Sequence, residues 1–244
     1  MTLRASRNSR VPAVESKAVV VELAFDLLCP WSYVMKRRLE RVIDQLDKPI
    51  QLTFRGFEMN PGMPNAGMPR TIYDRARCGN QSGTKRDLKS LCDAGRALGL
   101  DFDYQRLTVA PNTNMSLQML HFAEQSGQES AALEALFEAY YGQGLNISHR
   151  HILLDLGEKI GLSRTRLETH LAGLFSQRHV AKERKWLKEA GVRRVPAVFI
   201  GGALLSQGPV DESELRRMLE DSILTLKGRK KSPEPPPQAC DLAE

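Results

Sequence analysis

Strand-like sequence lies near both ends of this chain, and a long run of helix-like sequence separates the two parts. The expected order is strand, helix and strand over 19–25, 31–46 and 50–57, helices over 63–185, strands at 197–200 and 203–206, and a helix from 211 to 226. A helix between two strands is typical of a βαβ unit with parallel strands. The chain is therefore expected to be an α/β protein with a large helical insertion.

Local signals support the ends of these elements. In the first helix, Val34, Leu39 and Val42 supply an apolar face, and Lys36 is expected outside it. The glycine pair at 201–202 separates two short apolar runs, which predicts a hairpin. Asp211, followed three residues later by a glutamate, has the spacing of a capping box and predicts the start of the last helix.

The composition is that of an ordinary soluble globular protein, with 41% hydrophobic and 26% charged residues among 244. Much of the net charge of +6 lies in residues 1–18, which carry four basic residues and one acidic residue and are expected to form a disordered arm. Residues 228–244 are expected to be a disordered, proline-rich tail. Because the rest is nearly neutral and has no run of about 18 apolar residues, we expect a cytoplasmic protein without nucleic-acid or membrane partners.

The segment Cys29-Pro30-Trp31-Ser32 lies where the first strand ends and the first helix begins. The N-terminus of a helix offers free backbone N–H groups and the positive end of the helix dipole, and both favour a thiolate over a thiol. Pro30 suits the first helical turn because its missing N–H is not needed there. Cys29 is therefore the candidate nucleophile, and an inert buried cysteine is the alternative.

Four segments of the chain are distinctive as a set. They are Asp26-Leu27-Leu28-Cys29-Pro30-Trp31, Phe57-Glu58-Met59-Asn60-Pro61, Ala110-Pro111-Asn112-Thr113 and Gly191-Val192-Arg193-Arg194-Val195-Pro196. Together they resemble the DsbA family of thioredoxin-fold proteins, and most closely its FrnE-like branch. The FrnE-like branch is related to 2-hydroxychromene-2-carboxylate isomerases and kappa-class glutathione transferases. The resemblance implies a thioredoxin-like domain formed by 19–62 and 186–227, with a helical insertion domain at 63–185.

Ser32 departs from the dithiol motif of the FrnE-like relatives. A second cysteine at this position would attack a mixed disulfide on Cys29 and release the partner, and a hydroxyl is too weakly acidic to do so. The site is therefore expected to work as a monothiol that needs an external thiol such as glutathione. Ser32 either donates a hydrogen bond to the Cys29 thiolate or is a plain first-turn serine, and the sequence leaves both open.

The resemblance also implies a substrate pocket. Pro196 has the position of the family's cis-proline, which would expose the backbone of Val195 to a bound ligand. Trp31 is expected either to wall this pocket or to lie in the core. The remaining expected contacts are Pro30, Phe57, Asn60, Asn112 and Thr113. The two asparagines and Thr113 have an alternative role in turns and helix caps.

Three functions remain open at this point. The leading one is a DsbA-like thiol-disulfide oxidoreductase, and the others are a glutathione-dependent isomerase or transferase for a small hydrophobic molecule and a non-catalytic peptide-binding or chaperone module. No tightly bound cofactor is expected, glutathione is the expected co-substrate, and the protein is expected to be a monomer or homodimer.

The other cysteines and the histidines give weaker signals. Cys92 is expected in a helix core, and Cys240, in the tail, is a less favoured candidate for the missing resolving thiol. The five histidines show no pattern of a metal site, and no metal is expected.

Overall fold

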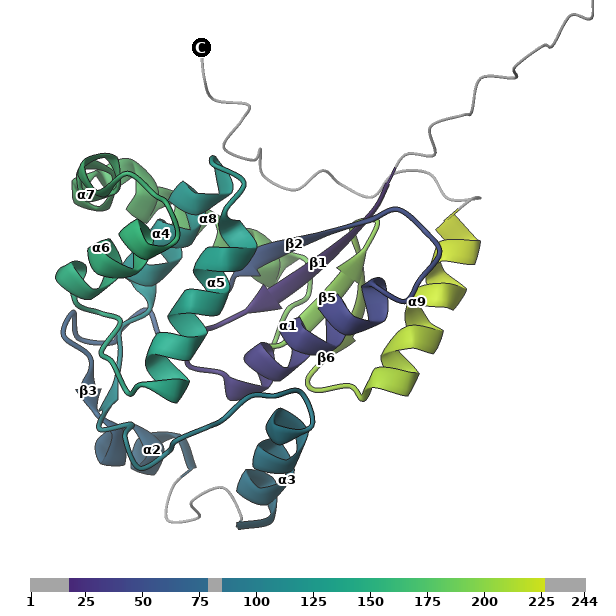
Figure 1. Ribbon diagram of the computed structural model, residues 1–244, viewed down its shortest axis with the longest axis horizontal. Coiled ribbons are helices and arrows are strands. Elements are labelled where there is room, and N and C mark those ends of the chain that lie inside the picture. Colours follow the sequence, from purple (N-terminus) through teal and green to yellow (C-terminus); the bar gives the residue numbers. More distant parts are fainter. Residues whose placement is uncertain (1–17, 79–84, 227–244) are drawn as a thin grey trace, which may run out of the picture.

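A four-stranded mixed sheet forms the centre of the computed structural model, which describes residues 18–78 and 85–226 (Figure 1). Its strands are β1 (Val19–Phe25), β2 (Ile50–Gly56), β5 (Ala197–Ile200) and β6 (Ala203–Gln207), in the order β2-β1-β5-β6. β1 and β2 are parallel, whereas β5 is antiparallel to both of its neighbours. The predicted α/β thioredoxin fold is confirmed.

The strands form where the sequence predicts them, and their turns have the expected geometry. β1 and β2 pair in register from Val19 with Ile50 to Phe25 with Gly56. The hairpin between β5 and β6 turns at Gly201 (φ 55°) and Gly202 (φ 79°), a backbone region that side chains strain.

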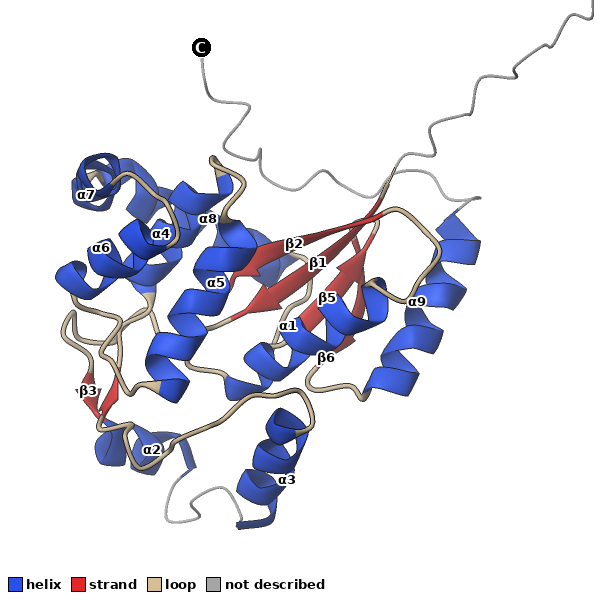
Figure 2. Ribbon diagram, viewed as in Figure 1, coloured by secondary structure: helices blue, strands red, loops and turns tan. Residues whose placement is uncertain are grey.

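Helices cover both faces of the sheet (Figure 2). The helices α1 (Pro30–Ile43) and α9 (Glu212–Leu226) lie on one face, where they pack on the core that contains Leu23 and Val198. The helix α8 (Leu174–Glu189) packs on the other face, beside Ala24 and Phe199, because neighbouring residues of a strand point to opposite sides. Asp211 caps α9 as predicted, since its Oδ1 accepts a hydrogen bond from Glu214 N at 2.8 Å.

Between β2 and β5 the described part of the chain forms helices that are joined by loops. The helices are α2 (Arg70–Cys78), α3 (Lys85–Arg96), α4 (Asn114–Glu124), α5 (Glu129–Phe137), a π-helical turn (Glu138–Gly142), α6 (Arg150–Lys159) and α7 (Arg164–Ala172). The same segment contains a short sheet of β3 (Met68–Pro69) and β4 (Val109–Ala110), which the sequence pattern does not predict because two-residue strands carry no periodicity. The helical segment and the sheet share one hydrophobic core, and α8 crosses the expected domain boundary at 185–186.

Lys36 was expected outside the apolar face of α1, but the structure buries it. Its side chain is only 2% exposed, and its ammonium lies 2.7 Å from Glu40 Oε1 and 2.8 Å from Glu134 Oε2. Glu134 also accepts a hydrogen bond from the Tyr33 hydroxyl and pairs with Arg37. Helical spacing shows which residues share a face, but the acidic partner on α5 that makes burial of Lys36 tolerable is visible only in the tertiary structure.

Several sequence expectations fall outside the described residues. These are the basic arm apart from its last residue, the proline-rich tail, and Cys240 as a candidate resolving thiol. Among the helices that the structure describes, none combines the length and apolar character needed to cross a membrane.

Candidate active site

Cys29 lies at the N-terminus of α1, where the turn after β1 ends. It is the N-cap residue, with extended backbone angles (φ −99°, ψ 103°), and Pro30 follows within the first turn as predicted. Its backbone N–H donates to Asp26 O at 2.9 Å, and the residue is 6% exposed. The sulfur therefore meets the positive end of the α1 dipole, in a residue that is nearly buried.

The tertiary fold brings Cys29 against Val195, which is 166 positions away in the sequence. The Cys29 sulfur donates to the Val195 carbonyl oxygen at 3.5 Å. The Val195-Pro196 bond is cis, as the resemblance implied. Cys29 and Val195 are buried together with Phe57 in a small apolar cluster under α8.

Ser32 lies one helical turn after Cys29 and is fully buried. Its backbone N–H donates to the Cys29 carbonyl oxygen at 2.9 Å. Its hydroxyl has no hydrogen-bond partner in the part of the chain that the structure describes. An unpaired buried hydroxyl costs about 1–3 kcal/mol, so a charged acceptor that forms on Cys29 would be a favourable partner for it.

Asp26 is a site residue to which the sequence analysis assigned no role. Its carboxylate is fully buried, and it accepts hydrogen bonds from Leu28 N at 2.8 Å and from Met59 N at 2.6 Å. One side chain thus fixes both the turn that carries Cys29 and the loop after β2. The sequence signal that could have identified Asp26 is a single acidic residue directly after an apolar strand.

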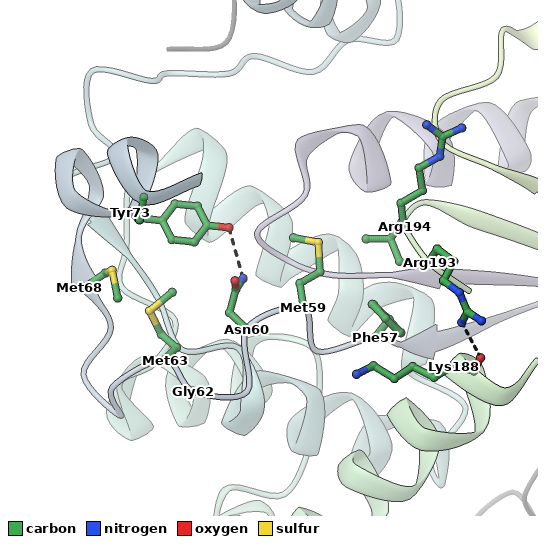
Figure 3. A pocket seen from close by; sticks show the side chains of 12 residues that line it. Phe57, Met59, Asn60, Gly62, Met63, Met68, Tyr73, Lys188, Arg193 and Arg194 are labelled. Carbon is green, nitrogen blue, oxygen red and sulfur yellow. Dashed lines mark hydrogen bonds between the residues drawn. The ribbon is translucent and has the colours of Figure 1, made fainter. Parts of the chain in front are cut away.

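A cavity of about 670 Å³ lies beside Val195 (Figure 3). Its wall is built mainly from apolar side chains of the loop after β2, of β3 and of α2, and from cationic side chains at and just after the end of α8. The apolar part includes Phe57, Met59, Met63, Met68 and Tyr73, and the cationic part is Lys188, Arg193 and Arg194. In the figure the methionines lie on one side and the cations on the other. The cavity suits a ligand that combines apolar and anionic groups.

The expected binding residues fall into two groups. Phe57 and Asn60 line this cavity with Val195, and the Asn60 amide donates to the Tyr73 hydroxyl at 3.3 Å. Trp31 is partly buried and packs against both apolar clusters, so it contributes to the core as well as to the region of Cys29.

Asn112 and Thr113 are not among the described residues that line this cavity. The Asn112 amide donates to Met63 O at 2.7 Å, which fixes the loop after β2, and Thr113 is buried as the N-cap residue of α4 without a side-chain cap bond. The structure therefore uses Asn112 in the scaffold, and direct contact of either residue with a ligand stays a prediction.

Three histidines that look unrelated in the sequence pack together between α4, α7 and α8. The His121 ring is stacked on His179 with centroids 3.7 Å apart and lies 5.3 Å from His170. Burial, and next the charges of its two neighbours, lower the pKa of His121 to about 3. The described residues contain no group of three His, Cys, Asp or Glu side chains placed to hold a metal ion.

Cys92, expected in the core, is half-buried.

The arrangement can support nucleophilic chemistry at one sulfur. Cys29 is oriented by the helix terminus and by the Val195 carbonyl, and the cavity beside Val195 is large enough for a tripeptide-sized ligand. No second cysteine lies at the position that would release a mixed disulfide, because Ser32 occupies it.

Comparisons with known proteins agree with this geometry. The family model of the DSBA-like thioredoxin domain matches residues 20–220. The chain is similar to a probable DsbA oxidoreductase from Streptomyces coelicolor (21% identity, 88% of this chain and 93% of that one, TM-score 0.77). It is also similar to the cytosolic disulfide reductase DsbM from Pseudomonas aeruginosa (20%, 84% and 99%, TM-score 0.61) and to a 2-hydroxychromene-2-carboxylate isomerase (21%, 85% and 96%, TM-score 0.57). Another structure of DsbM was solved with glutathione.

Proposed function

Because this chain belongs to the family of DSBA-like thioredoxin domain proteins, we propose that it is a monothiol thiol-disulfide oxidoreductase that uses glutathione as its resolving thiol. The observation that carries the proposal is the position of Cys29. Its sulfur lies at the N-terminus of α1 and 3.5 Å from the carbonyl oxygen before a cis-proline, with a serine at 32.

The reaction proceeds by two thiol-disulfide exchanges. Cys29 loses its proton to solvent, and its thiolate attacks one sulfur of a disulfide, so that a new S–S bond forms and the other sulfur leaves as a thiolate. Because Ser32 cannot attack this mixed disulfide, the thiolate of glutathione does so, which forms a disulfide with the bound group and returns Cys29 as a thiolate. The two steps conserve electrons, since one disulfide is broken for each one formed.

The cationic side of the cavity supports glutathione as the co-substrate. Lys188, Arg193 and Arg194 form no ion pair with a described residue, and the Arg193 guanidinium donates to the Lys188 carbonyl oxygen at 2.9 Å. Glutathione carries two carboxylates, and unpaired cations beside Val195 are suited to bind them. The disulfide reductase DsbM, which shares the fold, has been solved with glutathione.

A test is the reaction of the whole protein with oxidised glutathione, followed by intact mass. The proposal predicts one glutathione per chain, retained until reduced glutathione or another thiol is added. Cys29→Ala should lose the adduct, and Cys92→Ala is the matched control that should keep it. An adduct that survives Cys29→Ala, or wild-type protein that stays unmodified, would contradict the assignment of Cys29.

A second candidate is a glutathione-dependent isomerase or transferase that acts on a small hydrophobic molecule. The methionine-lined side of the cavity favours it, because thioether side chains adapt to flat apolar ligands. In this reaction glutathione supplies the reacting sulfur and Cys29 is not consumed. Turnover that requires glutathione and survives Cys29→Ser would support this candidate over the redox reaction.

A further inference from the structure

A second cavity, of about 400 Å³, lies on the other side of the loop after β2. Its wall is formed by this loop, by α4 and by the start of α8. Of the described residues, Met63 alone lines both this cavity and the one beside Val195. Its lining differs in chemistry from the first cavity, because it consists mainly of one carboxylate and several carboxamides. Among its lining residues that the structure describes there is no lysine, arginine or histidine.

The carboxylate is Glu58, which is 6% exposed. One of its oxygens accepts a hydrogen bond from the Asn114 amide at 3.1 Å. The other has no hydrogen-bond or ion-pair partner among the described residues, and Glu58 is one of the residues that line the cavity. A carboxylate removed from bulk water in this way is stabilised strongly by a cation that reaches its free oxygen.

The neighbouring amides are held in fixed orientations. Asn112 Oδ1 accepts from Asn114 N at 2.9 Å, and Asn114 Oδ1 accepts from the Gln118 amide at 2.8 Å. The Gln118 oxygen in turn accepts from Ser176. These bonds leave the carboxylate oxygen of Glu58 as the unsatisfied acceptor that the network presents to the cavity.

The charge and the lining of the cavity favour a cationic ligand with an aliphatic part. The N-terminus of α4 contributes a partial positive charge of about half an elementary charge, so the full charge of Glu58 keeps the cavity negative. An ammonium group donates three hydrogen bonds, and the side-chain oxygens of Glu58, Asn65 and Gln177 could accept them. Met63 and Met115 provide apolar surface for an attached aliphatic chain.

We propose that this cavity is a binding site for an aliphatic primary amine, whose ammonium pairs with Glu58. The site is independent of the reaction at Cys29, and it is separated from the first cavity by the loop that carries Phe57 and Met59.

The test is a titration of full-length protein with pentylammonium, followed by backbone amide NMR. It is carried out in the Cys29→Ala background, so its outcome does not depend on the proposed redox function. Pentanol and pentanoate, which have the same chain with no charge and with a negative charge, are the comparison ligands. We expect pentylammonium to shift signals of 58–65 and 114–118 and to bind more tightly than either comparison ligand.

Glu58→Gln removes the charge but keeps an oxygen for Asn114, and it should weaken pentylammonium binding by about 10- to 100-fold. The matched control is Glu189→Gln, which removes an exposed carboxylate from α8 and should change nothing. If Glu58→Gln does not fold, Gln177→Trp fills the cavity from an exposed helical position and should also abolish binding. Equal binding of pentanol or pentanoate, unchanged amine binding in folded Glu58→Gln protein, or unchanged binding in Gln177→Trp would overturn the proposal.

Discussion

The buried hydroxyl of Ser32 gives the sharpest test of how the site prepares its sulfur. It lies one turn from Cys29 with no partner in the described part of the chain. If the hydroxyl turns toward the sulfur once the proton has left, its hydrogen bond stabilises the thiolate and not the thiol. Replacing Ser32 with alanine should therefore raise the pKa of the Cys29 thiol.

The size of the effect follows from hydrogen-bond energies. A hydrogen bond to a charged acceptor is worth about 1.5–3 kcal/mol, and one pKa unit corresponds to about 1.4 kcal/mol. Ser32→Ala should thus raise the pKa of the thiol by about 1–2 units. At low pH, where the thiol is neutral, the same substitution removes an unpaired hydroxyl and should stabilise the fold by about 1 kcal/mol.

The pKa is measured from the rate of Cys29 alkylation by iodoacetamide against pH, and stability from urea unfolding at pH 5. Ser116→Ala is the matched control, because this buried serine already donates to Ile147 O at 2.7 Å. Ser116→Ala should lower the free energy of unfolding by about 1 kcal/mol and leave the pKa of the Cys29 thiol unchanged. A Ser32→Ala variant that loses stability as Ser116→Ala does, with a thiol pKa within about 0.3 unit of the wild type, would refute the reasoning.

Three further predictions concern release, pH and the buried lysine. Ser32→Cys should supply the missing resolving thiol, so that the glutathione adduct on Cys29 no longer accumulates in the mass assay. The pKa of His121 in the folded state is lowered to about 3, so its contribution to stability is present above about pH 6.5 and is lost as the pH falls. The free energy of unfolding, measured in urea, should therefore fall by about 2 kcal/mol less between pH 7 and 5 in His121→Phe than in the wild type. The same pH dependence in both proteins would contradict this. Lys36→Met leaves Glu134 without its closest buried cation and should cost about 3 kcal/mol in the same assay, whereas a cost below about 1 kcal/mol would show that the pair is not effectively buried.

Much of the fold was predictable because its signals are local. The apolar runs of β1 and β5, the glycine turn at 201–202 and the cap at Asp211 act over a few residues, and each is found where the sequence indicates it. The pairing of β1 with β5 is different, because it joins residues more than 170 positions apart. The resemblance to a family placed both strands in one domain, and the pairing itself is seen only in the structure.

The candidate site was predictable only in part. The sequence indicates Cys29 and Pro196, and the fold brings the sulfur to the carbonyl just before this proline. The roles of Asp26 and Glu58 were missed, because an acidic residue in a sequence shows neither its burial nor its partners.

By itself the sequence determined the chemistry that is available: one cysteine at a strand-to-helix turn, and a serine where a second thiol would act. Helix dipoles, turns and caps depend on near neighbours, so they can be inferred from adjacent residues. Tertiary structure alone decided which distant groups meet, namely the Val195 carbonyl at the sulfur, Glu134 at Lys36 and the amide network at Glu58. The physical reason is that burial and electrostatic pairing act through space and not along the chain.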